Sequence, residues 1–111
     1  MTKTRILGGL VFGVVAGLAI AAYADQTHPS KTFLQYCAKC HGEDGKAQTP
    51  KGQQLKAQDF TDADWQEHES DAELIKVVTE GGMDMPAFGK KLSAEQIESL
   101  VKNDVRGFVK K

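Results

Sequence analysis

The only two cysteines of the chain stand in the segment Cys37-Ala38-Lys39-Cys40-His41. The C-x-x-C-H spacing is typical of covalent haem attachment, in which both thiols bond to vinyl groups of the porphyrin and the next residue ligates the iron. Residues three apart lie on one face of a helical turn, so Cys37 and Cys40 can reach the same edge of a flat ring. The segment therefore predicts one covalently bound haem c, attached at Cys37 and Cys40, with His41 as an axial ligand of the iron.

Three other readings of this segment are less favourable. A redox dithiol of the thioredoxin kind needs a βαβ context, but residues after 25 carry no alternating strand pattern. A zinc site could combine the segment with His28 or His68, yet structural zinc usually takes two separated ligand pairs. A disulfide between Cys37 and Cys40 would close a very short loop and so stabilise little. His28 is otherwise assigned no role.

The second axial ligand is sought in the apolar loop 83–88, which contains two methionines. A thioether is neutral and soft, so it suits Fe(II) and raises the reduction potential relative to a second imidazole. Pro86 fixes the backbone after Met85 and biases Met85 to an extended conformation, which holds its side chain out from the loop. We therefore predict Met85 as the iron ligand and expect Met83 to fill the core.

Helices must position these residues, and the first is predicted over about 30–39. Phe33, Leu34 and Cys37 share one of its faces, which places an aromatic ring beside the haem attachment point. Residues 41–58 are rich in Gly, Asp, Gln and Lys and are predicted to form a loop.

Within that loop, Pro50 or its neighbour could offer a carbonyl oxygen to the ring N–H of His41. An ordinary turn over residues 49–52 is the other interpretation.

Three later segments complete the predicted fold. A short helix begins at Thr61 as N-cap, and Phe60 meets Trp65 across its start. Trp65 either packs on the haem and bonds a propionate or is a plain core residue. A capping box opens a helix over 70–81, and another opens a last helix from 92, which should cross the first. The buried stripe of the 70–81 helix is predicted to be Leu74, Ile75, Val77 and Val78.

The N-terminal residues 1–24 read as a signal peptide. Lys3 and Arg5 precede an apolar stretch, and Ala22-Tyr23-Ala24 is an A-x-A cleavage site. We expect cleavage after Ala24, export to the bacterial periplasm, one mature domain over 25–111 and no stable membrane insertion. An uncleaved anchor is the alternative, since about 17 apolar residues lie at the short end of a membrane span.

Charge excludes one class of partner and suggests another. The leader removes two of the 14 basic residues and none of the 15 acidic ones, so the mature charge of −3 argues against nucleic acid. Seven carboxylates and no Lys or Arg lie between 57 and 75. Lysines instead flank the haem motif and the methionine loop, where they could steer docking to acidic partners. These lysines are Lys39, Lys46, Lys51, Lys56, Lys90 and Lys91.

The order of these motifs resembles the class I c-type cytochromes, which are small monohaem proteins of bacteria. The resemblance covers residues 30–109 and rests on the C-A-K-C-H-G segment from Cys37, on Met85-Pro86-Ala87-Phe88 and on the V-R-G-F run from Val105. It implies thioethers at Cys37 and Cys40, His41 as proximal ligand and Met85 as distal ligand.

Two departures from the family pattern concern the contact between the first and last helices. Pro29 stands where the family commonly has glycine, eight residues before the first cysteine. The family's terminal L-V-x-Y-V-R run also has one more residue here and no aromatic residue.

The sequence thus predicts an all-α, cytochrome c-like bundle of about four short helices around one covalent haem. Its expected function is single-electron transfer between larger redox proteins, as a monomer and not as an enzyme. A haem protein with an open sixth site, acting as a gas sensor or like a peroxidase, is the first alternative. A metal-free thiol oxidoreductase is the second.

Overall fold

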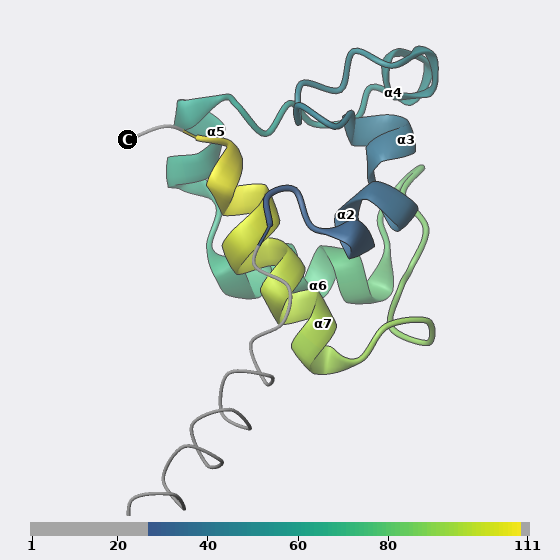
Figure 1. Cartoon of the computed structure of the whole chain (residues 1–111), viewed down its shortest axis with the longest axis vertical. Coiled ribbons are helices and arrows are strands. Elements are labelled where there is room, and N and C mark those ends of the chain that lie inside the picture. Colours follow the sequence, from purple (N-terminus) through teal and green to yellow (C-terminus); the bar gives the residue numbers. More distant parts are fainter. Residues whose placement is uncertain (1–26, 110–111) are drawn as a thin grey trace, which may run out of the picture.

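A computed structural model describes residues 27–109, and apart from one isolated bridge between Gly82 and Met85 their regular structure is helical. The all-α prediction is confirmed, whereas the predicted leader and its cleavage site lie outside the described residues. No helix within 27–109 is long and apolar enough to cross a membrane. Figure 1 shows the helices, which are α2 (Lys31–Tyr36), α3 (Ala38–His41), α4 (Pro50–Leu55), α5 (Ala63–His68), α6 (Asp71–Glu80), α7 (Ala94–Ser99), the π-helical turn η2 (Leu100–Val105) and the 3₁₀ turn η3 (Arg106–Phe108).

The first predicted helix forms as two short helices, α2 and α3. Ser30 caps α2 by accepting the backbone N–H of Phe33, and Cys37 separates the two segments with φ −117°. Phe33 is buried as expected, but Leu34 is 42% exposed. Phe33 and Leu34 therefore do not share a buried face of α2.

The segment 41–58 is not wholly a loop, because it contains α4. The side chain of Thr49 accepts the N–H of Gly52 at 2.9 Å, and Pro50 occupies the first helical position, where its missing N–H costs nothing. Lys56 ends the helix in the left-handed conformation, with φ 56°. Six residues with few apolar side chains gave no periodic signal, so only the cap could have revealed this helix.

The next helix, α5, begins one residue later than predicted. Asp62 is its N-cap and accepts the N–H groups of Asp64 and Trp65, while the hydroxyl of Thr61 donates to Asp59 instead. The expected contact between Phe60 and Trp65 is present, with ring centroids 5.6 Å apart and stacked.

Helices α6 and α7 start as the capping signals predicted. Ser70 caps α6, and Ser93 forms a full capping box with Gln96 at the start of α7. Leu74 is buried, but Val77 is 42% exposed and was wrongly placed in the buried stripe.

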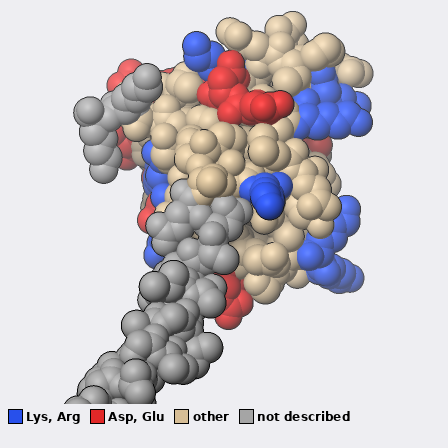
Figure 2. Space-filling model, viewed as in Figure 1, with Lys and Arg blue, Asp and Glu red and all other residues tan. Residues whose placement is uncertain are grey.

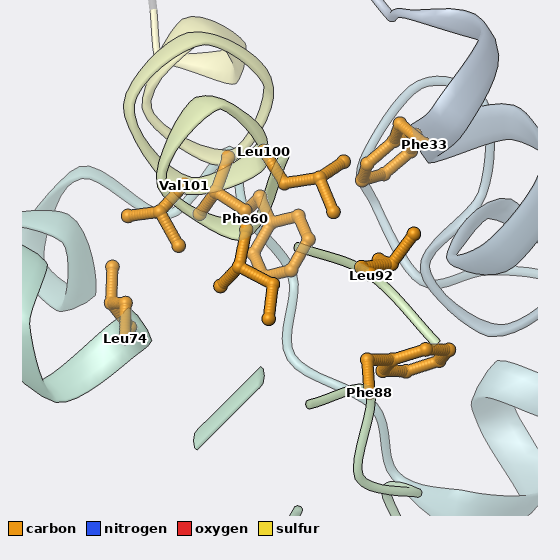
Figure 3. Packing of buried hydrophobic residues seen from close by; sticks show 9 residues of the cluster. Phe33, Phe60, Leu74, Phe88, Leu92, Leu100 and Val101 are labelled. Atoms are coloured by element: carbon orange, nitrogen blue, oxygen red, sulfur yellow. The ribbon is translucent and has the colours of Figure 1, made fainter. Parts of the chain in front are cut away.

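Buried apolar side chains from all parts of the described chain form one core (Figure 3). The guanidinium of Arg106 connects the last helical turn to α5 and α6. It donates to the carboxylate of Asp71 and to both the backbone and the side-chain oxygen of Gln66. The Gln66 amide in turn donates to the carbonyls of Phe60 and Val105. The core residues are Phe33, Phe60, Leu74, Phe88, Leu92, Ile97, Leu100, Val101 and Val105.

The segment before α2 packs closely against the end of the chain at a glycine. This glycine is Gly107 of η3, and not a residue before Cys37 as in the family pattern. A Cβ on Gly107 would lie 2.8 Å from the ring of His28, so the side chain of Gly107 must be absent for the two segments to approach. A second close approach joins Gly45 to Phe108, since a Cβ on Gly45 would lie 2.6 Å from the phenyl ring.

Candidate functional site

The two cysteines stand on a single helical turn. The N–H groups of Cys40 and His41 both donate to the carbonyl oxygen of Cys37, at 3.2 and 2.9 Å. Both thiols are half-buried and neither forms a disulfide. This is the local geometry that the C-x-x-C-H spacing predicted, and it leaves both sulfur atoms available for another bond.

The Cys37 thiol is held in its protonated form. Burial raises its pKa to about 12, and the negative charge of Asp104 and then the neighbouring Cys40 add to the effect. A redox-active C-x-x-C pair has the opposite property, because its attacking thiol needs a lowered pKa to supply thiolate at neutral pH. The environment of Cys37 therefore argues against thiol oxidoreductase chemistry.

One ring nitrogen of His41 is hydrogen-bonded to the backbone, which orients the imidazole. Its Nδ1 lies 3.0 Å from the carbonyl oxygen of Gln58, and since a carbonyl can only accept, Nδ1 must carry the proton. Burial lowers the pKa of His41, and the bond to Gln58 partly opposes this, so the imidazole is neutral at pH 7. Within residues 27–109 its Nε2 has no hydrogen-bond partner, which leaves a lone pair for a metal.

The structure corrects the predicted partner of this ring. Neither Pro50 nor a neighbour supplies the carbonyl; Pro50 instead lies at the start of α4. The ordinary turn proposed for residues 49–52 is also wrong, because these residues begin a helix. Gln58 could not be found from sequence, since the donor's partner is a backbone atom and any residue type offers the same carbonyl.

Helix α4 nevertheless supports the haem motif from outside. The hydroxyl of Thr49 donates to the carbonyl of Lys39 at 2.6 Å. A Cβ on Gly52 would lie only 2.0 Å from the carbonyl oxygen of Cys40, so the two helices touch backbone to backbone at this glycine. The turn that carries Cys40 and His41 is thus held in place by α4.

Aromatic rings surround the imidazole. The ring of Phe60 stacks on His41 with centroids 4.3 Å apart and an interplanar angle of 17°, and Trp65 stacks on the Phe60 ring. Trp65 is half-buried and packs against the core, whereas its predicted bond to a propionate stays a prediction. Elsewhere in the core, Tyr36 meets Phe88 edge to face at 5.9 Å. Sequence reasoning did not single out Tyr36.

The two methionines of the predicted ligand loop differ sharply in position. Met85 is half-buried and packs against the core, and its N–H and C=O both bond to Gly82, at 2.6 and 3.1 Å. Met83 lies at the tip with φ 32° and is fully exposed. The expectation that Met83 fills the core was wrong, because the tight bridge between Gly82 and Met85 turns the intervening residue outward.

All six predicted docking lysines are exposed to solvent. In the view of Figure 2 basic side chains lie on the right-hand edge but also at the top, in the centre and on the left, and acidic side chains are interspersed with them. Of the seven carboxylates between 57 and 75, Asp71 is not simply solvated, since it pairs with Arg106 at 2.8 Å.

The residues present fit a covalently attached haem. They supply two free thiols on one turn, a neutral imidazole with one nitrogen oriented by a backbone carbonyl, and an apolar and aromatic surrounding. That donor set, on an all-helical domain, defines a c-type cytochrome.

Comparison with known proteins identifies the family. The family model described as "Cytochrome C oxidase, cbb3-type, subunit III" matches residues 24–102, and the chain belongs to this cytochrome c family. Among solved structures, the KustC0563 c-type cytochrome is 43% identical with a TM-score of 0.67, covering 72% of this chain and 95% of that one. A mutant of the same protein is 44% identical with a TM-score of 0.64, covering 70% and 94%.

Two curated relatives are much longer proteins. The Cbb3-type cytochrome c oxidase subunit FixP of Azorhizobium caulinodans is 36% identical over 72 residues, which are 64% of this chain and 23% of that protein. FixP of Bradyrhizobium diazoefficiens is 29% identical over 87 residues, which are 78% of this chain and 29% of the relative. The chain therefore spans less than a third of the length of these relatives. Haem c, covalently bound, is its cofactor.

Proposed function

We propose that this cytochrome is a periplasmic single-electron carrier whose haem iron is ligated by His41 and Met85. The observation that carries the proposal is the bond from His41 Nδ1 to the Gln58 carbonyl, which leaves Nε2 as the only ligating nitrogen. When bound, the haem supplies a reversible one-electron change between Fe(III) and Fe(II).

Met85 is the thioether that the fold favours as the second ligand. Its side chain packs against the core that also receives Phe88 and Leu92, whereas the side chain of Met83 points into solvent. The hydrogen-bonded bridge to Gly82 fixes the backbone of Met85 before Pro86. A ligand held by a rigid loop keeps its place in both oxidation states, which suits a carrier.

A carrier needs no substrate pocket at the metal. If His41 and Met85 both hold the iron, no coordination position would be left for a substrate, and the domain would transfer electrons without acting as an enzyme. The stacked rings of Phe60 and Trp65 would exclude water from the imidazole side.

The predicted leader supports export, because c-type haem is attached after translocation.

The partners would be larger redox proteins with acidic docking surfaces. Exposed lysines flank both the haem motif and the methionine loop, and complementary charges raise association rates at low salt. The FixP relatives are named as oxidase subunits, which supports a place beside a respiratory redox complex. The domain itself would act as a monomer.

The ferric absorption spectrum tests the ligation. The weak red absorption of an iron–methionine bond should be present in the purified protein. Its absence would favour the alternative with an open sixth site, the gas sensor or peroxidase-like protein. The metal-free thiol oxidoreductase is excluded, because the family match gives the chain a covalently bound haem c.

A further inference from the structure

The hydrogen bond to Gln58 sets the direction in which Nδ1 of His41 points, but it leaves a second freedom of the imidazole open. The ring can still turn about the line of that bond, because carbonyl oxygens accept over a broad range of angles. The last side-chain torsion of a histidine also lacks a sharply preferred value. Some other contact must therefore determine how the plane of the ring lies.

A second contact acts on the face of the His41 ring. The phenyl ring of Phe60 lies nearly parallel to the imidazole, with centroids 4.3 Å apart and an interplanar angle of 17°. Turning the imidazole out of this plane would drive its edge into the phenyl face, since packed rings have little free space around them. The hydrogen bond thus sets the direction of Nδ1, and the stack sets the tilt of the plane.

Both contacts come from one short segment, residues 58–60. Its first residue offers the carbonyl and its last residue offers the phenyl ring. The N–H of Phe60 also donates to the carbonyl of Gly45 at 2.7 Å, in the loop that leaves the haem motif after His41. The phenyl ring is therefore positioned relative to the imidazole by the backbone as well as by packing.

Phe60 is itself closely enclosed and only 7% exposed. The rings of Trp65 and Phe108 stack on it at 5.6 and 6.1 Å, and the ring of Phe33 meets it edge to face at 6.3 Å. Its carbonyl oxygen accepts the side-chain amide of Gln66 at 2.8 Å. A ring with this many neighbours has little room to move aside for another orientation of the imidazole.

We propose that Phe60 is a positioning residue that sets the plane of the axial imidazole relative to the haem. A ligand whose orientation the protein fixes does not have to reorient when the iron changes its oxidation state, which suits one-electron transfer. This inference rests on the proposed role of His41 as an axial ligand, and it gives Phe60 no contact with the iron. It does not depend on which residue holds the opposite position.

Proton NMR of the ferric cyanide complex tests this role. Cyanide occupies the iron position opposite to His41, whatever ligand it displaces there, and it has no plane of its own. The shifts of the haem methyl resonances in this complex therefore report the orientation of the imidazole. A missing iron–methionine band would contradict ligation by Met85 and leave this measurement unaffected, so the two ideas fail separately.

The decisive variant is Phe60→Leu, which keeps a buried apolar side chain and removes the flat face. Its haem methyl resonances should differ in order or spread from those of wild type. Phe60→Tyr restores the aromatic face and should return the wild-type pattern, even if its added hydroxyl lowers stability.

The matched control is Phe33→Leu. Phe33 is 1% exposed and also contacts Phe60, but within residues 27–109 it forms no ring contact with His41. This variant should lower stability in denaturant unfolding, because it truncates a core aromatic residue. Its methyl pattern should nevertheless stay close to that of wild type.

Three outcomes would overturn the proposal. The first is a wild-type methyl pattern in Phe60→Leu, and the second is an equal change in Phe33→Leu or Phe60→Tyr, because general loosening of the core would then explain the shift. The third is the absence of nuclear Overhauser contacts between the ring protons of His41 and Phe60 in the reduced wild-type protein, since rings 4.3 Å apart must give them. This third measurement needs no variant, so it stands even if Phe60→Leu fails to fold.

Discussion

The imidazole of His41 is oriented by a carbonyl seventeen residues further along the chain, that of Gln58, at 3.0 Å. Because the acceptor is a backbone atom, the bond survives any side-chain change at Gln58 that keeps the local fold. It fixes which nitrogen is free, and so it determines from which side of the ring a metal can be bound. Each expectation about the iron site starts from this bond.

The first prediction concerns the opposite axial ligand. Met85→Ala should abolish the weak red absorption of the ferric protein, because the iron loses its thioether. Met83→Ala is the matched control in the same loop, and it should leave the band unchanged, since the Met83 side chain is fully exposed. Loss of the band in Met83→Ala alone would mean that the ligand assignment is reversed.

The second prediction concerns haem removal. A Cys37→Ala/Cys40→Ala double variant cannot attach haem, and the remaining small domain would have a marginal core. We expect no cooperative thermal transition by circular dichroism. A sharp transition in the haem-free variant would show that the protein core is sufficient by itself.

The third prediction follows from the pKa of Cys37. In the folded environment this pKa is raised to about 12, against an ordinary value of 9.0. In the holoprotein the sulfur is bonded to haem and does not titrate, so the expectation concerns the haem-free chain alone. Any fold that this chain kept would be fully stabilised below pH 9 and would lose stability toward pH 12, because the unfolded chain gives up a proton that the fold retains. If haem-free wild-type chain is disordered, alkylation of its thiols should follow the ordinary pKa. A midpoint near 12 would show that the fold persists without haem.

The fourth prediction concerns the contact between α4 and the haem motif. Gly52→Ala would place a Cβ against the carbonyl of Cys40 and should lower the free energy of unfolding by about 1–3 kcal/mol, as overpacking typically does. Gly82→Ala is the control, because nothing lies within 4 Å of its added Cβ. Denaturant unfolding of both holoproteins measures the difference, and equal stabilities would refute the close contact.

The fifth prediction concerns the guanidinium that joins α5 and α6 to the last helix. Arg106→Ala removes donors from Asp71 and from Gln66, so the free energy of unfolding should fall by about 1–3 kcal/mol. Lys102→Ala breaks only an exposed ion pair with Glu98 and should cost no more than about 1 kcal/mol. The same denaturant titrations measure both losses. A larger loss in Lys102→Ala than in Arg106→Ala would contradict the prediction.

The haem motif and the helix starts could be predicted because their signals are local. Cys37, Cys40 and His41 need only one turn of helix, and Ser93 with Gln96 forms its capping box within four residues. The resemblance to c-type cytochromes was confirmed by the family match. The Met85 ligand remains a prediction.

The features that could not be predicted depend on partners distant in sequence. The carbonyl of Gln58 and the ring of His28 acquire roles only when separate segments meet. Val77 and Leu34 belong to apolar patterns that short helices did not bury. Asp104 is buried at a position where apolar spacing predicts a hydrophobic residue, and its hydrogen-bond donors on Ser30 lie near the other end of the described chain.

The contact between Phe108 and Gly45 joins the last described helical turn, η3, to the segment that follows the haem motif. A side chain at position 45 would push the phenyl ring away and separate the two segments. The smallest residue type therefore connects the C-terminal turn to the loop that leads on from His41.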